Sequence, residues 1–302
     1  MVLDMKLNET QRDFVIKQDY YRTDQQLAED VTKLMEWMSK QPHLPEITDK
    51  KWLSHFLIGC KYNLHRAKRT IDSYFVSRAE YPEFICSFDR EQLLNESKKS
   101  GSICVFPKLT SEACRVMCTR LVPTSKDTKL DFLLYFQVML GNLDLQMKEE
   151  PMRGEIMLLD LEHLSLSQFM SMPPSLIKNA LNLCINSFPV SIKGIHYVNS
   201  PSYIGQMISF FKMFLPNKIQ KRIFVHDTLE SLHQFIPKDV LPAQYGGTAG
   251  DYDDILKDWL EYGMANNEWL KNRPKADLSK WVGQPKIGEL GVEGTFKKLE
   301  ID

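Results

Sequence analysis

The side chains of this 302-residue chain that could support catalysis are few and scattered. Asp160 and Glu162 are the one suggestive pair of carboxylates, because residues two apart on a strand share a face. His163 follows them, but no nucleophile accompanies it. The chain contains none of the patterns GxGxxG, GxxxxGKS/T, GxSxG and HExxH, which mark nucleotide sites and active sites. We therefore predict no catalytic residue and interpret the carboxylate pair as a solvated strand end.

Cysteine and histidine positions predict no metal site. No two cysteines form a CxxC pair, and no cluster of cysteine and histidine has the spacing of a zinc site. His196 and His226 lie in or beside expected strands, where structural roles are the commoner ones. Free thiols are typical of a reducing compartment, so we expect a cytoplasmic location. The six cysteines are Cys60, Cys86, Cys104, Cys114, Cys118 and Cys184.

The overall charge excludes a general attraction to nucleic acid. Lysine and arginine total 38 against 39 for aspartate and glutamate, so the net charge is −1. Attraction to an anionic membrane must then come from a local group of basic residues. Apolar residues make up 43% and charged residues 25%, as in soluble globular proteins. No apolar run reaches the ~18 residues that span a bilayer, and no signal-type stretch opens the chain.

The most informative segment, residues 203–223, is both apolar and basic. It contains no acidic residue. One interpretation is an ordinary amphipathic helix that covers a sheet. The other is a movable cover, whose apolar face closes a cavity and whose basic end meets anionic lipid head groups. The apolar face consists of Ile204, Met207, Ile208, Phe211, Phe214 and Leu215, and the basic residues are Lys212, Lys218, Lys221 and Arg222.

A second segment favours a cavity. Residues 132–140 form one crowded apolar helix, and several of the chain's 14 methionines fall in the same half of the sequence. Methionine adapts to ligands of irregular shape, although the filling of an ordinary core is its commoner role. The methionines alone therefore leave both interpretations open.

Two regions with different sequence patterns must position these segments. Residues 1–90 are predicted to be helical: Thr23 with Gln26 forms a capping box, and Asn63 can cap a later helix. From residue 102, short apolar runs alternate with helical periods, which predicts an α/β fold with parallel strands and right-handed crossovers. The expected strands are 102–106, 120–123, 155–161, 193–198 and 222–225. The expected helices are 111–118, 129–147, 173–188, 202–215 and 251–263, followed by an irregular tail.

Several blocks of sequence resemble the CRAL-TRIO lipid-binding family. FLIGCKYN at 56–63, with Ala67, Tyr74 and Arg78 after it, is similar to the N-terminal helical module of these proteins. Four further blocks stand in the order and spacing of the family's lipid-binding domain. They are GEIMLLDLE at 154–162, FPVSIKGIHYVNSPSY at 188–203, FLPNKIQKRIFVH at 214–226 and LPAQYGGT at 241–248.

The resemblance implies an α/β fold in three parts: a helical module at 1–90, a CRAL-TRIO lipid-binding domain at 91–262 and a mostly irregular tail at 263–302. In the domain, a mostly parallel sheet with crossover helices forms an apolar cavity under a helical lid. The implied function is non-catalytic: the protein binds one tocopherol-, retinoid- or carotenoid-like ligand and delivers it at anionic membranes. No cofactor other than this lipophilic ligand is expected, nor any metal or nucleic acid.

The same resemblance assigns roles to individual residues. The implied lid residues are Tyr203, Ile208, Phe210, Phe214 and Leu215. The residues that match or lie near the family's basic patch for phosphoinositide head groups are Lys193, Lys218, Lys221 and Arg222. The cavity lining that we expect is Phe132, Tyr135, Phe136, Met139, Met157, Leu159, Leu183, Phe188, Ile192, Ile195, Ile204, Met207 and Phe211.

The chain departs from the tocopherol carriers of the family at a few positions. Ile58, Cys60 and Ser191 replace basic residues, which weakens or alters the implied phosphoinositide recognition. Glu155 replaces an apolar residue that faces the ligand, and we expect it at the exposed start of its strand. Two alternatives remain open: a phospholipid or phosphoinositide exchange protein, and a lipid-sensing regulatory or scaffold module with a vestigial cavity.

Overall fold

The computed structural model describes residues 6–17, 23–85, 89, 92–93, 95, 99–123, 125 and 128–282. Its strands are β1 (Gly101–Val105), β2 (Cys114–Leu121), β3 (Gly154–Asp160), β4 (Ile192–Val198) and β5 (Ile223–Val225). Its α-helices are α1 (Glu9–Lys17), α2 (Asp24–Met38), α3 (Lys50–Gly59), α4 (Leu64–Glu80), α6 (Phe132–Gln146), α7 (Leu166–Met170), α8 (Pro174–Ser187), α9 (Ile204–Lys212), α10 (Asn217–Gln220), α11 (Leu229–His233), α12 (Tyr252–Ala265) and α13 (Asn267–Lys271). Short 3-10 helices are η1 (Pro82–Phe84), η2 (Ala243–Tyr245) and η3 (Leu278–Lys280).

Helices α2, α3 and α4 form the centre of the N-terminal module. The capping box of Thr23 with Gln26 and the cap by Asn63 are both present, as predicted. Such caps accept hydrogen bonds from N–H groups that a first helical turn leaves without intrahelical partners, so they fix where each helix begins. Trp52 of α3 packs edge-on against Tyr74 of α4, with ring centroids 5.3 Å apart. This aromatic contact joins the two helices.

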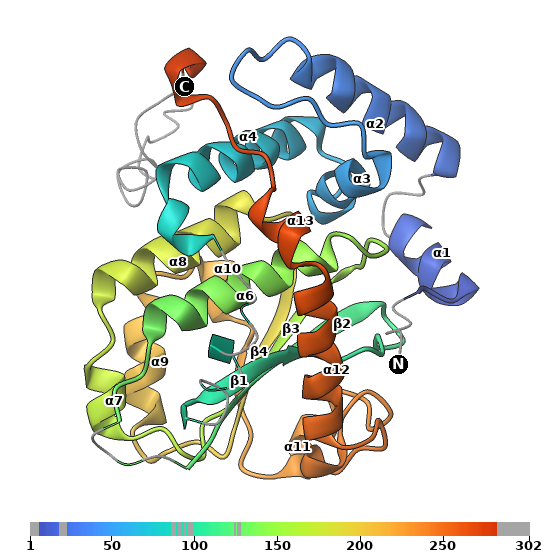
Figure 1. Ribbon diagram of the computed structural model, residues 1–302. Helices are drawn as coiled ribbons and strands as arrows, with labels where there is room; N and C mark the ends of the chain where they lie inside the picture. The colour runs from blue at the N-terminus through green and yellow to red at the C-terminus, as the bar shows by residue number, and fades with distance from the viewer. Residues whose placement is uncertain are drawn as a thin grey trace, which may run out of the picture.

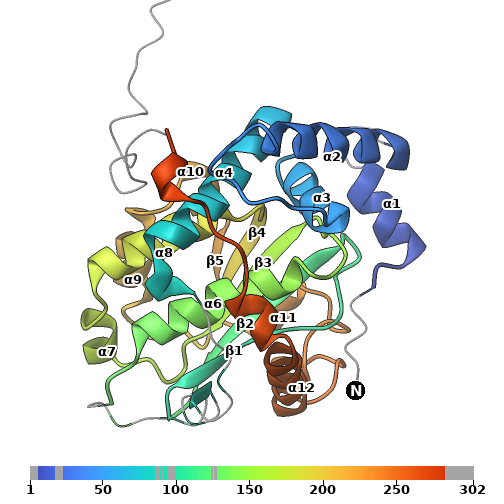
Figure 2. The ribbon, with the colours of Figure 1, turned by 45° about the horizontal axis from the view of Figure 1, so that its top comes forward.

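The strands form one sheet in the order β1-β2-β3-β4-β5. β2 to β5 are parallel to one another, as predicted, whereas β1 pairs antiparallel with β2. Each parallel pair requires a crossover, and such crossovers are right-handed. Because every new strand is added on the same side of the last, the crossover helices all fall on one face. Figures 1 and 2 show α6, α8 and α9 together on this face.

The helix predicted at 111–118 is wrong, because this segment is a turn that leads into β2. Ala113 turns the chain with a positive φ of 55°, and Thr110 N donates to Cys114 O at 2.9 Å. The connection is a hairpin, too short for the crossover of a parallel pair. β2 is buried along most of its length, so it lacks the alternation by which a strand is recognised in sequence. The predicted strand at 120–123 overlaps only its end.

The opposite face of the sheet is covered by the chain that follows β5. The Tyr252 hydroxyl lies 3.0 Å from Ser102 Oγ of β1, and the Tyr245 hydroxyl donates to Asp160 of β3 at 3.0 Å. α11 packs on β4, and α12 packs beside β1 (Figure 1). The sheet is therefore sandwiched between its own crossover helices and the C-terminal part of the chain.

Buried Asp144 of α6 fastens the N-terminal module to the α/β domain. The Tyr74 hydroxyl donates to one of its carboxylate oxygens at 2.5 Å, and the Arg78 guanidinium pairs with the other at 2.7 Å. Gly59, at the end of α3, lies against the backbone of Pro189. A Cβ on this glycine would stand 1.8 Å from the Pro189 carbonyl oxygen, so only glycine fits. The module is thus both ion-paired and close-packed at this junction.

The segment of α13 and η3, which we call the C-terminal strap, runs from α12 back to the N-terminal module (Figures 1 and 2). The Arg273 guanidinium lies over the rings of Trp269 and Trp52, 4.4 and 4.6 Å from their centroids. It also donates to the Tyr74 hydroxyl at 3.0 Å. Ala276 N then donates to a carbonyl group of α4 at 3.0 Å. The strap therefore binds the module through ring, side-chain and backbone contacts.

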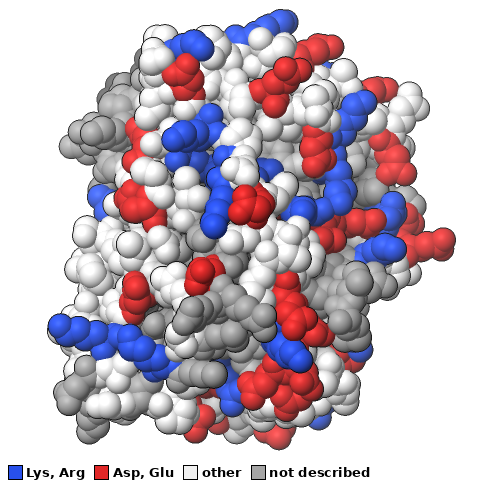
Figure 3. Space-filling view, viewed as in Figure 1, with Lys and Arg blue, Asp and Glu red and all other residues white. Residues whose placement is uncertain are grey.

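The charges of the surface are mixed on the face that Figure 3 shows. Basic and acidic side chains are interspersed there over the N-terminal module and α12. This agrees with the nearly balanced composition of the chain. Among the described residues, no helix is long and apolar enough to cross a membrane.

We predict that Asp144→Ala lowers the free energy of unfolding by about 3–5 kcal/mol, because it removes the carboxylate that faces the buried Arg78 guanidinium. Urea denaturation at pH 7 measures the change. Asp239→Ala, in an exposed loop, is the matched control and should alter stability by less than ~0.5 kcal/mol. Equal effects of the two substitutions would show that the Asp144 junction does not stabilise the protein.

Candidate functional site

A mostly apolar cavity of about 210 Å³ lies between the sheet and the helices α6, α8 and α9. One water molecule needs roughly 10–15 Å³ of such volume, so on the order of 15 would fit. Close-packed interiors leave few voids larger than one water, so this cavity is not a packing defect. The residues around it are Leu93, Ser100, Gly101, Ser102, Ile103, Thr119, Leu121, Leu130, Asp131, Phe132, Leu134, Tyr135, Phe136, Val138, Met139, Met157, Leu159, Leu161, Leu164, Met172, Leu181, Cys184, Ile185, Ile192, Ile195, Tyr197, Met207, Phe211, Leu215 and Leu260.

The register of the sheet decides which strand residues form the floor of the cavity. Thr119, Leu159 and Tyr197 are paired neighbours across β2, β3 and β4, and Met157 pairs with Ile195 in the next such row. Successive residues of a strand point to opposite faces. These two rows therefore face the crossover helices, and the residues between them face the C-terminal part of the chain.

Most of the lining residues expected from the sequence surround this one cavity. They come from α6, β3, β4 and α9, which are far apart in the chain but adjacent in the fold. Leu215 of the predicted lid also reaches the cavity. The expected residues found around it are Phe132, Tyr135, Phe136, Met139, Met157, Leu159, Ile192, Ile195, Met207 and Phe211.

Three of the expected lining residues lie elsewhere. Leu183 is buried in the main core, because α8 turns its neighbour Cys184 toward the cavity instead. Phe188 packs edge-on against Tyr74, with ring centroids 5.5 Å apart, and so joins the contact with the N-terminal module. Ile204 packs in a smaller apolar cluster at the start of α9. Helical and strand periods alone could not separate these neighbouring faces.

The predicted lid corresponds to α9, which is shorter than the expected helix. Met207, Phe211 and Leu215 are the lid residues that line the cavity. The other predicted lid residues pack around the smaller apolar cluster or the edge of the core; they are Tyr203, Ile208, Phe210 and Phe214. Phe169 of α7 stacks on Tyr203 and meets Phe210 edge-on, so α7 braces the lid from outside.

Sequence reasoning missed several residues that the structure places around the cavity. Tyr197 and Thr119 belong to the floor, and Leu260 of α12 reaches it from the β1 side. The alternation of a strand offered a signal for Tyr197, because it stands two residues after the expected Ile195. No comparable signal existed for Thr119, since β2 itself was not recognised.

The cavity contains hydroxyl groups but hardly any charge. Thr119 Oγ1 lies 3.1 Å from the Tyr135 hydroxyl. Asp131 is the one charged residue among the described lining residues, and its carboxylate accepts a hydrogen bond from Leu134 N at 3.0 Å as the cap of α6. Such an interior favours apolar ligands with few, uncharged polar groups.

Glu155 is not at an exposed strand start, so that prediction is wrong. Its side chain is 1% exposed and lies one pleat beyond Met157 on the cavity face of β3. Gln146 Nε2 donates to one carboxyl oxygen at 3.4 Å. Burial raises the pKa of Glu155 to about 8, and the nearby Arg115 opposes this only in part. The carboxyl is therefore mostly protonated at neutral pH, which is how the interior accommodates it.

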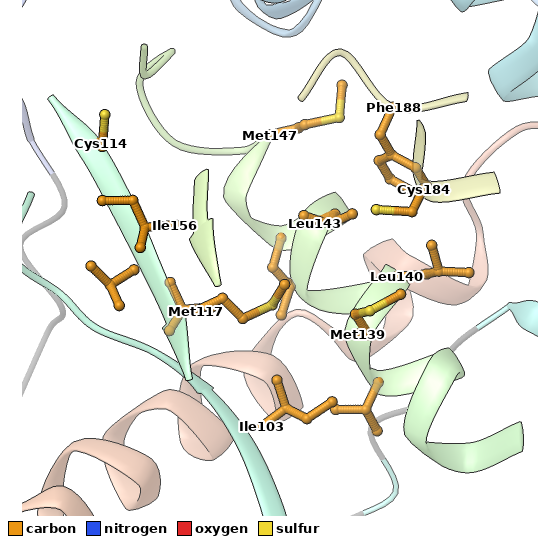
Figure 4. Close-up of a cluster of buried hydrophobic side chains, with 14 of the residues drawn as sticks. Ile103, Cys114, Met117, Met139, Leu140, Leu143, Met147, Ile156, Cys184 and Phe188 are labelled. Carbon is orange, nitrogen blue, oxygen red and sulfur yellow. The ribbon is translucent and has the colours of Figure 1, made fainter. Parts of the chain in front are cut away.

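A packed apolar cluster closes the cavity at the end where Met139 and Cys184 lie. Met139 and Cys184 line the cavity, and next to them Leu143, Met147 and Met117 gather in the same cluster (Figure 4). The side chains come from α6, α8 and β2, so the closure joins helices to sheet. Methionine and leucine side chains there can shift more easily than rings, which leaves the end wall adaptable.

Asp160 is likewise not part of a solvated strand end. It is 4% exposed and accepts hydrogen bonds from the Tyr245 hydroxyl and from Asn199 Nδ2, both at 3.0 Å. Asn199 has a positive φ of 49°, a conformation that asparagine tolerates better than most residues. Glu162, by contrast, is exposed. The predicted carboxylate pair therefore divides: Asp160 anchors the loop that leads to the lid, and Glu162 faces solvent.

The histidines of the sheet form no recognisable catalytic or metal centre. His196 Nδ1 lies 2.9 Å from His226 Nε2, and His226 Nδ1 lies 2.9 Å from Ser231 Oγ. Burial, and to a lesser extent His226, lowers the pKa of His196 to about 4, so it is neutral. The pair lies on the face opposite to the cavity. Over the described part of the chain, no three histidine, cysteine or acidic residues are grouped as metal ligands would be.

Basic residues gather where the chain leaves the lid. The pKa of Lys218 is lowered, first by partial burial and then by the charges of Arg222, Lys61 and Arg66. Lys61 and Arg66 belong to the N-terminal module, so both parts of the protein contribute. Ile58 and Cys60, which stand where the tocopherol carriers have basic residues, are buried. We call this group the basic patch; it comprises Lys193, Lys218, Lys221, Arg222, Lys61 and Arg66.

The raised pKa of Glu155 predicts a pH dependence of stability. Its pKa is 4.5 in the unfolded chain and about 8 in the fold, so the folded state holds the proton more tightly. Its contribution to stability is complete below pH 4.5 and is lost as pH rises through 8. Glu155→Gln, which cannot titrate, should gain stability relative to the parent between pH 5 and 8, by at most ~1.4 kcal/mol per pH unit.

Urea denaturation at pH 5, 6.5 and 8 measures this gain. Glu162→Gln, at an exposed carboxylate, is the control and should follow the parent protein at each pH. If Glu155→Gln also follows the parent, the carboxyl is ionised in the fold and the assignment of its proton is wrong.

Two family models match the chain. The model for the CRAL/TRIO domain matches residues 99–247, which include the sheet, the cavity helices and the lid. The model described as a Pinta-like UBA domain matches residues 23–92, which include α2 to α4. The two matches follow the division between the N-terminal module and the α/β domain.

Several named relatives are similar over much of the chain. "Alpha-tocopherol transfer protein-like" from Mus musculus is 29% identical over 272 residues, covering 86% of this chain and 77% of the relative. The protein of the same name from Homo sapiens is 29% identical over 233 residues, covering 74% and 66%. "Clavesin-1" from Xenopus laevis is 26% identical over 234 residues, covering 75% and 70%.

A solved structure supports the fold. "Crystal structure of Sfh5" superposes with a TM-score of 0.50 at 11% sequence identity and covers 87% of this chain and 98% of that one. At this identity the likeness concerns the fold alone. The family model over the sheet, cavity helices and lid gives the assignment: residues 99–247 form a CRAL-TRIO domain.

Proposed function

We propose that this protein binds one small lipophilic molecule in the cavity beneath α9 and carries it between membranes without changing it chemically. The observation that carries the proposal is the apolar cavity between sheet, crossover helices and lid. The CRAL-TRIO family and the transfer proteins among the relatives support a role in lipid binding.

Burial of apolar surface supplies the driving force. A tocopherol- or retinoid-sized ligand that buries ~400 Å² gains ~10 kcal/mol at ~25 cal/mol/Å², before the costs of immobilising it. The cavity is smaller than such a ligand needs, so side chains must move on binding. Met139, Met157 and Met207 line it, and their unbranched side chains can rearrange at low cost.

The lining favours tocopherol-, retinoid- or carotenoid-like ligands over phospholipids. A phospholipid head group carries a phosphate, which would require basic partners inside the cavity. Asp131 is the one charged group among the described lining residues, and it is acidic. The exchange of phospholipids is therefore the less supported alternative, and the tocopherol-like class is the one that we propose.

The basic patch is proposed to deliver the loaded protein to anionic membranes. Lys218, Lys221 and Arg222 of the patch directly follow the lid, and the sequence between Tyr203 and His226 contains no acidic residue. Met213, at the end of α9, is 69% exposed. Charge would hold the patch at the head groups while the apolar end of the lid reaches the acyl region.

The proposed binding is tested by lid substitution. Phe211→Asp places a charge against the cavity, whereas Met213→Asp changes an exposed residue two positions away. With α-tocopherol, retinal or retinol at 100 times its Kd, the parent should gain ~2.7 kcal/mol of stability. Phe211→Asp should abolish this gain, and Met213→Asp should retain it.

Differential scanning fluorimetry measures the gain, and circular dichroism verifies that each variant is folded. Lipid extracted from the purified parent and identified by mass spectrometry gives an independent assignment. A parent that shows no shift with any of these ligands, and yields no lipid, would rule out the carrier function and leave the scaffold alternative.

Membrane docking is tested with Lys218→Ala/Lys221→Ala, which leaves Arg222 in place because its guanidinium also donates to Ile192 O. At ~1 kcal/mol per cation, the double substitution should weaken association with phosphatidylserine vesicles ~30-fold. The effect should shrink from 50 to 500 mM NaCl, since exposed charges are screened by salt. Ligand affinity should not change.

Vesicle sedimentation measures this association. Lys238→Ala/Lys257→Ala removes two exposed lysines outside the patch and is the matched control. Equal losses for the two double variants, or equal losses on anionic and neutral vesicles, would show that the patch has no special docking role.

A further inference from the structure

Three hydroxyl groups from three elements meet the cavity. Thr119 of β2 and Tyr197 of β4 stand in one row of the sheet with Leu159 between them. Tyr135 comes from α6, which covers that row. All three line the cavity. We call these three hydroxyls the polar spot; apart from Ser100, Ser102 and Asp131, the rest of the lining is mostly apolar.

The three hydroxyls do not satisfy one another completely. Thr119 Oγ1 and the Tyr135 hydroxyl share a hydrogen bond of 3.1 Å. The Tyr197 hydroxyl makes no hydrogen bond to any residue that the structure describes, although the side chain is 4% exposed. A hydroxyl that faces an apolar cavity has neither a protein partner nor bulk water to bond with, which is unfavourable. Tyr197 is thus set to gain a partner when the cavity is filled.

The polar spot is electrically neutral. Burial raises the pKa of both phenols, so Tyr135 and Tyr197 keep their protons across the physiological range. The described lining contains no lysine, arginine or histidine. Asp131, its one charged residue, is occupied as the cap of α6. A carboxylate or phosphate placed here would lose its hydration without gaining a counter-charge.

The donors and acceptors of the spot match one uncharged oxygen. In the Thr119–Tyr135 pair one hydroxyl donates to the other, which leaves one proton and several lone pairs available. Tyr197 adds a second donor. A carbonyl oxygen can accept from these donors, and an alcohol can also donate to the free lone pairs. A hydrocarbon, which has no oxygen, would leave the Tyr197 hydroxyl without a hydrogen-bond partner.

We propose that Thr119, Tyr135 and Tyr197 form a subsite for a single neutral oxygen of the ligand, an alcohol or an aldehyde or ketone carbonyl, and that Tyr197 is its main specificity residue. This rests on the proposed function, because it concerns the ligand of the same cavity. It goes further by excluding fatty acids, phospholipids and pure hydrocarbons as preferred ligands.

Two matched sets of probes test the head-group preference. The first set is retinol, retinal, retinoate and the corresponding hydrocarbon, axerophthene; the second is hexadecanol, hexadecanal, hexadecanoate and hexadecane. Kd values come from quenching of tryptophan fluorescence or from competition with a probe that quenches it. On at least one skeleton, the alcohol and aldehyde should bind at least tenfold more tightly than the carboxylate and the hydrocarbon.

Substitution of Tyr197 assigns the preference to a residue. Tyr197→Phe removes one oxygen that makes no internal hydrogen bond, so the unliganded protein should melt no lower than the parent. Its affinity for the alcohol and aldehyde should fall about tenfold, while that for the hydrocarbon stays or improves. Tyr81→Phe is the control: it follows α4 in the N-terminal module, outside the lining, so head-group preference should not change.

The outcomes separate this proposal from the proposed function. If every head group binds equally well to the parent, or Tyr197→Phe weakens all probes by one factor, the subsite is wrong although the carrier function stands. If the carboxylates bind best, the neutral character of the subsite is wrong. If no member of either set binds, the proposed function fails and the subsite fails with it.

Discussion

The handedness of the crossovers is the constraint on which this structure depends. β2 to β5 follow one another in space as they do in sequence, so right-handed connections bring α6, α8 and α9 to a single face. The cavity lies between these helices and the sheet, and the lid is simply the last crossover before β5. The other face must be covered by whatever follows. Tyr245 and Tyr252 do this by placing their hydroxyls against β3 and β1.

Buried carboxyl groups around this core are accommodated in different ways. Asp144 accepts hydrogen bonds from both the Arg78 guanidinium and the Tyr74 hydroxyl. Asp160 accepts hydrogen bonds from Tyr245 and Asn199, whereas Glu155 is held in its protonated form. All three lie outside the cavity lining. Hydroxyls are therefore the main polar groups of the cavity lining, and such a lining suits uncharged molecules.

Sequence patterns predicted most helices and strands that have one buried and one exposed face. They were least reliable for β2, whose two faces are both buried. Asn63 and Thr23 marked helix starts because capping requires those residue types. The first five residues of β2 were predicted to be helical and only its end to be a strand, since a strand covered on both sides shows no alternation. The lining residues of the cavity were predicted from the spacing of apolar residues. This spacing could not show that Cys184 of α8, and not Leu183, faces the cavity. The burial of Glu155 depends on Gln146 and Arg115, which only the fold brings near it.

The C-terminal strap has a consequence for how the protein is made. Arg273 inserts between Trp52 and Trp269, and Ala276 bonds to the backbone of α4, so the N-terminal module is completed by residues some 200 positions later in the chain. During synthesis, N-terminal domains commonly fold as they emerge. Here the N-terminal module lacks part of its covering until residues 273 and 276, some 200 positions after Tyr74, have been translated. During that interval the rings of Trp52 and Tyr74 lack the contacts with Arg273 that cover them in the fold, so a nascent chain that ends before residue 273 exposes more of both rings than the folded protein does.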